Sequence, residues 1–198
     1  MTVDLRSFYP EPTDLAYAKQ LDRIDHHAAA FIARSPFLVI ATADSTGSCD
    51  ASPRGDAPGF VVVADERTLY LPDRPGNNRI DSLTNIAANP HVGMLFFIPG
   101  VIETLRVNGR ASFVADTTLL QQLSAHGHLP RSALVIEVEE VFFHCGKALK
   151  RSNLWDPGHQ VAAGEIPTLG RILADQTGKV GVAEAEERVR FAYENHLY

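Results

Sequence analysis

Short apolar runs separated by turns recur between residues 37 and 142. Few of these runs are followed by a segment with helical periodicity, whereas a parallel α/β sheet needs a helix after nearly every strand. The pattern therefore predicts a mainly β fold with inserted helices, a small antiparallel β-barrel of about six strands. We expect strands at 37–43, 60–63, 68–71, 92–98, 104–114 and 134–142, and an irregular, bulged edge strand at 50–56.

Helical periodicity precedes, interrupts and follows these strands. The first such segment predicts one amphipathic helix from about residue 13 to residue 35, with apolar positions at Tyr17, Leu21, Ile24, Ala28 and Phe31. Further helices are expected at 80–88, after Asp116, at 146–155 and at 183–196, with a loop at 156–181. We divide the chain into an N-terminal helical segment (1–30), a barrel (31–155) and a C-terminal loop and helix (156–198).

The same periodicities predict which side chains share a face. On the helix at 80–88, one face is expected to carry Ile80, Leu83, Thr84 and Ala87. On the last strand, the buried face is expected to carry Leu134, Ile136, Val138 and Phe142.

Charge and composition exclude several classes of protein. The formal net charge of −6 argues against a protein that coats nucleic acid or an anionic membrane, because both need a basic face. Cys49 and Cys145 have neither CxxC spacing nor a zinc-ligand pattern, no apolar run reaches the length of a membrane span, and the N-terminus is unlike a signal peptide. We expect a cytoplasmic protein with no nucleic-acid or membrane partner.

Standard catalytic and metal motifs are missing from the sequence. No G-x-G-x-x-G follows a strand, and neither H-E-x-x-H nor G-x-S-x-G is present. The His26-His27 pair, on adjacent helix positions that face different ways, and the pair His126 and His128 at a helix end predict no metal site. No catalytic residue is assigned from the sequence.

The turn at 71–79, which reads L-P-D-R-P-G-N-N-R, joins an expected strand to an expected helix. The free N–H groups of a helix's first turn favour a bound phosphate, and arginine adds a planar fork of donors. The turn therefore indicates an anion site, although Pro-Gly followed by Asn-Asn is also how an ordinary surface turn with an N-cap is written.

Two further polar segments contain arginine, S-P-R-G-D at 52–56 and K-A-L-K-R-S-N-L-W at 147–155. With 73–79 they could converge on one ligand that carries a phosphate and a flat ring system. Trp155 could pack on that ring or at a subunit interface; alternatively, it anchors the tail to the barrel.

These segments and their order resemble the pyridoxamine 5'-phosphate oxidase-related family of FMN-binding split barrels. The motifs that carry the resemblance are S-P-R-G-D, L-P-D-R-P-G-N-N-R, E-T-L-R-V-N-G-R-A and H-C-G-K-A-L-K-R-S-N-L-W, within residues 31–155. The resemblance implies a six-stranded antiparallel split β-barrel and a homodimer that binds FMN at the subunit interface. It also implies a flavin-dependent oxidoreductase acting on a small-molecule substrate.

The resemblance also assigns roles to residues. It places Arg54, with the backbone of Gly55 and Asp56, on the first strand that contacts the flavin. Asn77, Asn78 and Arg79, after Leu71 and Pro72, fall on the segment that grips the FMN phosphate. Thr104 stands where the family has a glutamine beside the flavin. The segment that closes the site contains Lys147, Arg151, Ser152 and Trp155, which the partner subunit could supply.

One departure from the family bears on the activity. The true oxidases carry an Arg-x-His that holds the substrate's phosphate, whereas the matching region here reads Lys150-Arg151-Ser152-Asn153. Oxidation of pyridoxamine phosphate is therefore not the expected reaction, and a nicotinamide or deazaflavin donor is one alternative. A flavin-binding or sensing protein without catalysis, a haem protein with His144 as axial ligand, and a structural dimer without ligand stay open.

Overall fold

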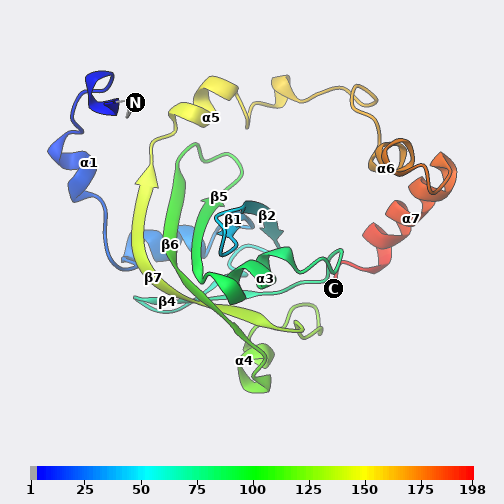
Figure 1. Ribbon diagram of the computed structural model, residues 1–198, viewed down its shortest axis with the longest axis horizontal. Helices are drawn as coiled ribbons and strands as arrows, with labels where there is room; N and C mark the ends of the chain where they lie inside the picture. Colours follow the sequence, from blue (N-terminus) through cyan, green and yellow to red (C-terminus); the bar gives the residue numbers. More distant parts are fainter. Residues whose placement is uncertain (1–3) are drawn as a thin grey trace.

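The computed structural model describes residues 4–198 and contains a seven-stranded antiparallel sheet (Figure 1). The order of strands in the sheet is β2-β1-β5-β6-β7-β4-β3, which leaves β2 and β3 as its edges. The strands are β1 (Phe37–Ala43), β2 (Cys49–Gly55), β3 (Val62–Asp65), β4 (Thr68–Pro72), β5 (His91–Phe97), β6 (Thr104–Val114) and β7 (Ala133–His144). The predicted mainly β, antiparallel fold is confirmed, with seven strands in place of six.

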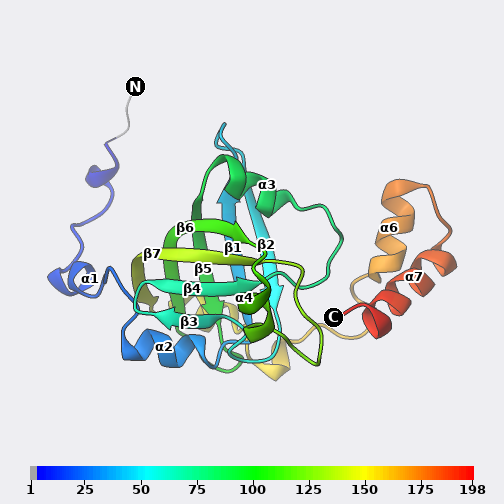
Figure 2. The same ribbon diagram turned by 90° about the horizontal axis from the view of Figure 1, so that it is seen from below.

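The sheet curls without closing, and its inner face holds the core. In Figure 2, β3, β4 and β7 run across the direction of β1, β2 and β5. Side chains from both halves meet inside and are fully buried, as in a split barrel. Among the largest are Leu38, Ile40, Leu69, Phe96, Leu105 and Ile136.

The expected irregularity at 50–56 is wrong. The register between β1 and β2 runs without a shift from Phe37↔Gly55 to Ala43↔Cys49, so β2 is a regular strand. Its position at the sheet edge is as predicted, and Pro53 is tolerated there because an edge strand has a free hydrogen-bonding side.

A β-bulge between β6 and β7 confirms the expected interruption at Asn108-Gly109. A Cβ added to Gly109 would lie 2.1 Å from the carbonyl oxygen of Glu137, so only glycine fits there. The bulge adds one residue to β7, and this reverses the alternation of side chains beyond it. Val141 is therefore buried and Phe142 faces outward, contrary to the prediction for Phe142.

The expected helix at 13–35 is two helices, α1 (Asp14–Ala18) and α2 (His26–Ile32). Between them, Leu21 exchanges backbone hydrogen bonds with Val141 and extends the edge of β7. The Asp25 carboxylate then caps α2 by accepting from the Ala28 N–H at 2.8 Å. Residues 1–3 of the expected N-terminal segment lie outside the described residues.

Two short helices flank the sheet near its loops. Helix α3 (Asp81–Ala88) packs against β1, β2 and β6. It buries Ser82 and Ile86, whereas Ile80 precedes the helix and is 60% exposed, so the predicted apolar face is wrong. Helix α4 (Thr117–Gln122) is capped by Asp116, as expected, through the Leu119 N–H.

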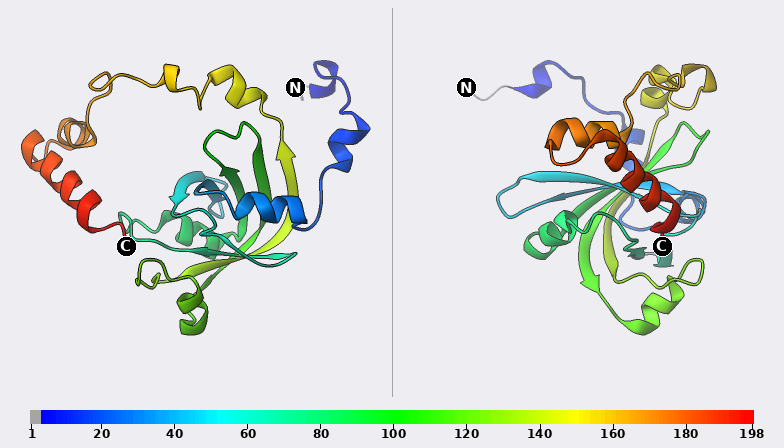
Figure 3. Two further views of the ribbon diagram at one scale, coloured as in Figure 1. Left: turned by 180° about the vertical axis from the view of Figure 1, so that it is seen from behind. Right: turned by 90° about the vertical axis from the view of Figure 1, so that its right-hand side faces the viewer.

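The chain beyond β7 leaves the sheet and returns to it. Helix α5 (Lys147–Ser152) is followed by residues 156–198, here called the C-terminal arm, with helices α6 (Leu169–Thr177) and α7 (Val182–Asn195) (Figures 1 and 3). Helix α6 replaces the expected loop, because Thr168 caps its start and Gly178 ends it at φ 61°. No helix within residues 4–198 combines the length and apolar character needed to cross a bilayer.

Candidate cofactor-binding site

A cavity of about 690 Å³ lies between β2, the loop after β4, the start of α3 and the residues before β7. Its volume falls within the range of about 300–1,000 Å³ typical of small-molecule sites. Two of the three arginine-bearing segments meet in it. The predicted site residues that line it are Arg54, Gly55, Pro72, Asn77, Asn78 and Arg79.

Arg54 enters the cavity wall from the edge strand β2. Its Nη1 donates to Asp73 Oδ1 at 2.9 Å, and the two side chains are 22% and 27% exposed. Its Nε is buried and has no acceptor among residues 4–198. A buried N–H without an acceptor costs free energy, so a ligand atom that accepts from it would be stabilised.

The loop before α3 opens the end of that helix to the cavity. Asn78 and Ile80 have positive φ values of 57° and 55°, a conformation that asparagine tolerates but that strains isoleucine. Ile80 is the N-cap residue, and its hydrocarbon side chain cannot accept a hydrogen bond. The first-turn N–H groups of α3 therefore have no side-chain cap and lie beside the cavity, the arrangement that favours an anion.

Arg131 and Ser132 also line the cavity, and the sequence analysis missed both. The Arg131 Nη1 donates to Asn78 Oδ1 at 3.2 Å, and within the described chain Arg131 has no carboxylate partner. Ser132 is 3% exposed, and its carbonyl accepts from the Asp73 N–H at 2.9 Å. The triplet Pro130-Arg131-Ser132 has the composition of Ser52-Pro53-Arg54, and that similarity was the available signal.

Arginine is the commonest charged residue of the cavity wall, which contains four arginines and three aspartates. Arg54 pairs with Asp73, Arg79 with Asp81 at 2.7 Å, and Arg74 with Asp56, which lies outside the lining, so these three guanidinium groups have counter-charges. Within residues 4–198, Arg131 is the wall arginine without a carboxylate partner, and it favours an anionic ligand. The four arginines are Arg54, Arg74, Arg79 and Arg131, and the aspartates are Asp50, Asp73 and Asp81.

Asp56 does not line the cavity. Its carboxylate, 2% exposed, accepts from Arg74 Nε at 2.5 Å and from the Tyr198 hydroxyl at 2.7 Å. Burial works against ionisation of Asp56, but hydrogen bonds from Tyr198, the Ala57 N–H and Arg74 outweigh it and hold its pKa below the usual value. Asp56 thus supports the wall from behind.

The remaining predicted residues lie away from the cavity. Leu71 is buried in the core, and Thr104 is buried at the start of β6, opposite His144. The Trp155 Nε1 donates to the Val101 carbonyl at 2.8 Å, which bears out the alternative that it anchors the tail. The structure does not bring α5 to the cavity within one chain. The α5 segment carries the predicted residues Lys147, Arg151 and Ser152.

Histidine and cysteine side chains also lie outside the cavity. His144 ends β7 beside the Phe142 ring, and its pKa is lowered by burial and by the charges of Arg106 and Lys19. The rings of His26 and His27 are not divergent as expected, since their centroids are 3.8 Å apart. Ligand atoms of these two residues and Asp25 lie within 4.8 Å of one another at an exposed turn.

Comparison with known proteins assigns the chain to a family. The sequence model of the pyridoxamine 5'-phosphate oxidase family matches residues 24–145, more than half of the chain. The chain belongs to that family. The resemblance drawn from the arginine-bearing motifs is thereby confirmed. The matched region contains the sheet and the whole cavity wall, whereas α5 and the C-terminal arm lie beyond it.

Solved structures align with the chain at low sequence identity. An H111A variant of HupZ from Group A Streptococcus aligns with a TM-score of 0.51 and 17% identity, over 61% of this chain and 99% of that one. An FMN-binding protein from Syntrophomonas wolfei gives a TM-score of 0.47 and 10% identity over 60% and 84%. General Stress Protein 26 from Bacillus anthracis gives 0.45 and 17% over 58% and 88%. No curated protein matches the chain.

Proposed function

We propose that the protein binds FMN in this cavity and acts as an FMN-dependent oxidoreductase on a small molecule. The observation that carries the proposal is the meeting of Arg54, Asn78 and Arg79, from two separate segments, with Arg131, which has no carboxylate partner within residues 4–198, beside the uncapped start of α3. A phosphate needs such cationic and N–H donors. Membership of the pyridoxamine 5'-phosphate oxidase family supports the same ligand.

Each part of the cavity matches one part of the cofactor. Arg79, Arg131, Asn78 and the first turn of α3 would hold the phosphate, and the buried Nε of Arg54 would donate to a polar atom of the ligand. Phe60 and Phe113 add apolar surface to the wall. Bound FMN supplies hydride or electron transfer, while the chain's residues bind and orient it. No protein nucleophile is required.

The position of α5 supports a homodimer. The cavity includes Arg131 and Ser132, which precede β7, whereas α5 follows its other end. Strand β7 has 12 residues, and at roughly 3.3 Å per residue it separates the two ends by more than the length of any side chain. If Lys147, Arg151 and Trp155 contribute to a flavin site, a second copy of the chain must supply them.

An absorption spectrum of the purified protein tests the cofactor. We expect flavin bands, or quenching of FMN fluorescence when FMN is added to colourless protein. No shift and no quenching would refute FMN binding, and a haem band lost in His144→Ala would support the haem alternative. Reduction of bound flavin by a nicotinamide or deazaflavin donor, followed by reoxidation by an acceptor, would distinguish an oxidoreductase from a non-catalytic flavin-binding protein.

Arg79→Ala tests the phosphate grip. The affinity for FMN should fall about ten- to a hundredfold, because charge-assisted contacts are among the stronger hydrogen bonds, while the affinity for riboflavin stays unchanged. Arg34→Ala is the matched control, since within residues 4–198 its guanidinium donates only to the Ala30 carbonyl and it lies outside the cavity. Equal losses for FMN and riboflavin would place Arg79 away from the phosphate.

A further inference from the structure

The buried carboxylate of Asp56 joins the cavity wall to the end of the C-terminal arm. Asp56 follows β2 and accepts three hydrogen bonds, from Arg74 Nε, from the Ala57 N–H at 2.6 Å and from the Tyr198 hydroxyl at 2.7 Å. A carboxylate that is only 2% exposed needs such partners, because an unpaired buried charge is costly. Loss of one donor therefore changes how the other two are held.

Arg74 is the member of this cluster that faces the ligand space. It belongs to the loop after β4, lines the cavity and is 14% exposed. Asp56 engages its Nε, and within residues 4–198 its two Nη groups donate to no protein atom. The contact with Asp56 thus fixes the guanidinium while leaving its outer donors available to an anion.

Tyr198 also contacts the loop that carries Arg131. Its ring lies 4.6 Å from the His126 ring and 6.4 Å from the His128 ring, between centroids. That loop continues into Arg131 and Ser132 of the cavity wall. In Figures 1 and 3 the arm crosses open space and brings its end back to the sheet beside these loops. The Tyr198 side chain therefore contacts both Asp56 and the loop that leads to Arg131 and Ser132.

We propose that Tyr198 is a positioning residue of the cavity. Its hydroxyl holds the Asp56 carboxylate, and Asp56 in turn holds Arg74 so that the two Nη groups of Arg74 face the anionic group of the ligand. This inference rests on the proposed binding of FMN, and it adds that the C-terminal arm affects FMN affinity through Asp56 and Arg74. Tyr198 lies in the C-terminal arm, outside the region matched by the family. By thermodynamic linkage, a bound anion also holds the arm against the sheet.

The first experiment compares Tyr198→Phe with wild type in FMN and riboflavin titrations. Phenylalanine keeps the ring beside His126 and removes only the hydroxyl donor. We expect FMN affinity to fall about three- to tenfold, the worth of one hydrogen bond, with riboflavin affinity unchanged. Tyr193→Phe is the matched control, because Tyr193 lies in the same arm and is 60% exposed. An unchanged ratio of FMN to riboflavin affinity in Tyr198→Phe would overturn the proposal.

A double-mutant cycle tests whether Tyr198 acts through Arg74. In an Arg74→Ala background, Tyr198→Phe should leave FMN affinity unchanged, since the guanidinium that it positions is gone. A loss as large as in the wild-type background would contradict the proposal. If Arg74→Ala does not fold, the comparison of Tyr198→Phe with Tyr193→Phe still tests whether the Tyr198 hydroxyl contributes to FMN affinity.

Trypsin digestion tests the reverse direction of the coupling. The arm offers cleavage sites at Arg171, Lys179, Arg188 and Arg190. FMN should slow cleavage of the arm in wild type and have a smaller effect in Tyr198→Phe, whereas riboflavin should protect neither. An arm that FMN does not protect in wild type would overturn the proposal, while wild type that binds no FMN at all would refute the proposed function itself.

Discussion

The sheet and the C-terminal arm of this protein are stabilised in different ways. Strands from 37 to 144 bury a continuous core in which Leu38, Phe96 and Leu105 are 0% exposed. Helices α6 and α7 pack on each other and bury only Gly170, Ala174 and Ala185. Within the described chain, residues 169–198 make one hydrogen bond to residues 4–155, from the Tyr198 hydroxyl to Asp56. The arm can therefore leave the sheet without loss of the core.

The largest effect should come from a cavity in the core of the sheet. Leu105→Ala should lower the free energy of unfolding by about 2–5 kcal/mol, because it removes a fully buried side chain. The matched arm variant Leu173→Ala, at a position 40% exposed, should change it by less than about 0.5 kcal/mol. Urea denaturation measures both, and comparable losses would mean that arm and sheet unfold as one unit.

The substitution Gly170→Ala should separate helices α6 and α7 of the C-terminal arm. A Cβ at this position would lie 2.6 Å from the Cα and backbone nitrogen of Glu186, so α6 and α7 must move apart. Faster proteolysis of the arm, with an unchanged unfolding midpoint of the sheet, is the expected result. Gly181→Ala is the control, since nothing lies within 4 Å of its added Cβ. Equal protease resistance of the two variants would contradict the packing.

Acid should release the arm before it unfolds the sheet. The pKa of Asp56 is lower in the folded protein than its usual value of 3.8, so its ionisation stabilises the closed arm above that pH. The contribution is lost as the pH falls below about 3.8 towards the lowered pKa. Amide hydrogen exchange in α6 and α7, corrected for intrinsic rates, should rise in that range. In Asp56→Asn this pH dependence should be absent, and its persistence would assign the release to another group.

The hydrogen bond between Tyr198 and Asp56 should also weaken at alkaline pH, where the stabilisation is lost as the pH rises. The Tyr198 hydroxyl has a raised pKa, chiefly because it donates to Asp56 and also because of burial and the negative charge of Asp56. Its stabilising effect is present below the usual pKa of 10.0 and is lost as the pH rises through the raised value. Spectrophotometric titration should show one tyrosine, absent in Tyr198→Phe, that ionises later than the others.

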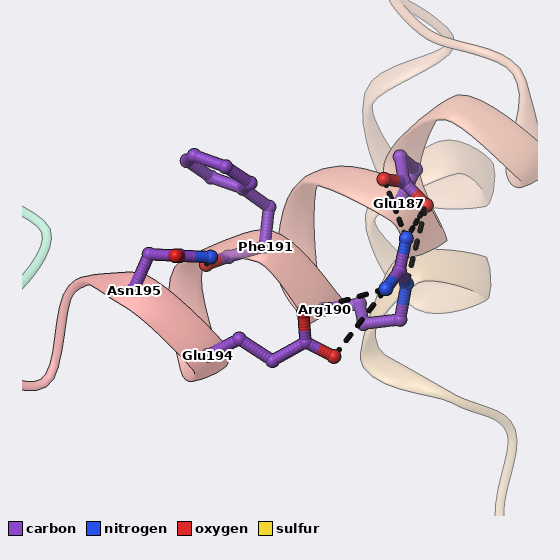
Figure 4. A network of polar contacts seen from close by, with 5 residues as sticks. All are labelled: Glu187, Arg190, Phe191, Glu194 and Asn195. Atoms are coloured by element: carbon purple, nitrogen blue, oxygen red, sulfur yellow. Dashed lines mark hydrogen bonds and ion pairs between the residues drawn. The ribbon is translucent and has the colours of Figure 1, made fainter.

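The smallest effect should come from ion pairs on the outer face of α7. Arg190 donates to Glu187 and Glu194, one turn away on either side (Figure 4). The three side chains are more than half exposed, and water and salt screen such pairs. Arg190→Ala should reduce the helix signal in circular dichroism slightly at low salt and not at high salt. A large loss at high salt would show that Arg190 holds more than its own helix.

Local patterns in the sequence predicted much of the sheet and part of the site. The apolar run at 37–43 is strand β1, and the Asn108-Gly109 interruption marks the bulge. Arg54, Asn78 and Arg79 line one cavity, as their arginine-bearing motifs indicated. Arg131 was missed because its short Pro-Arg-Ser triplet is a weak signal and reaches the cavity only through the pairing of β7 with β4 and β6.

Predictions failed where a distant residue determines local structure. Leu21 lies in a helical pattern, yet it pairs with Val141, because an open strand edge offers hydrogen bonds that compete with a helix. Phe142 faces outward because the bulge in β7, set by its pairing with β6, reverses the alternation. The contact of the Asp56 carboxylate with Tyr198 was not predicted from the sequence, because it joins residues that are distant along the chain.

The amino-acid sequence by itself determined the antiparallel β class, most strand positions, the family and the arginine-bearing motifs of the candidate site. These depend on short-range periodicity and turn chemistry, which can be read from neighbouring residues. Only the tertiary structure decided that Arg131 completes the cavity wall, that Asp56 lies behind it, and that Tyr198, 142 residues away along the chain, reaches Asp56. Such contacts depend on how the sheet curls and where the arm returns, and no local pattern encodes them.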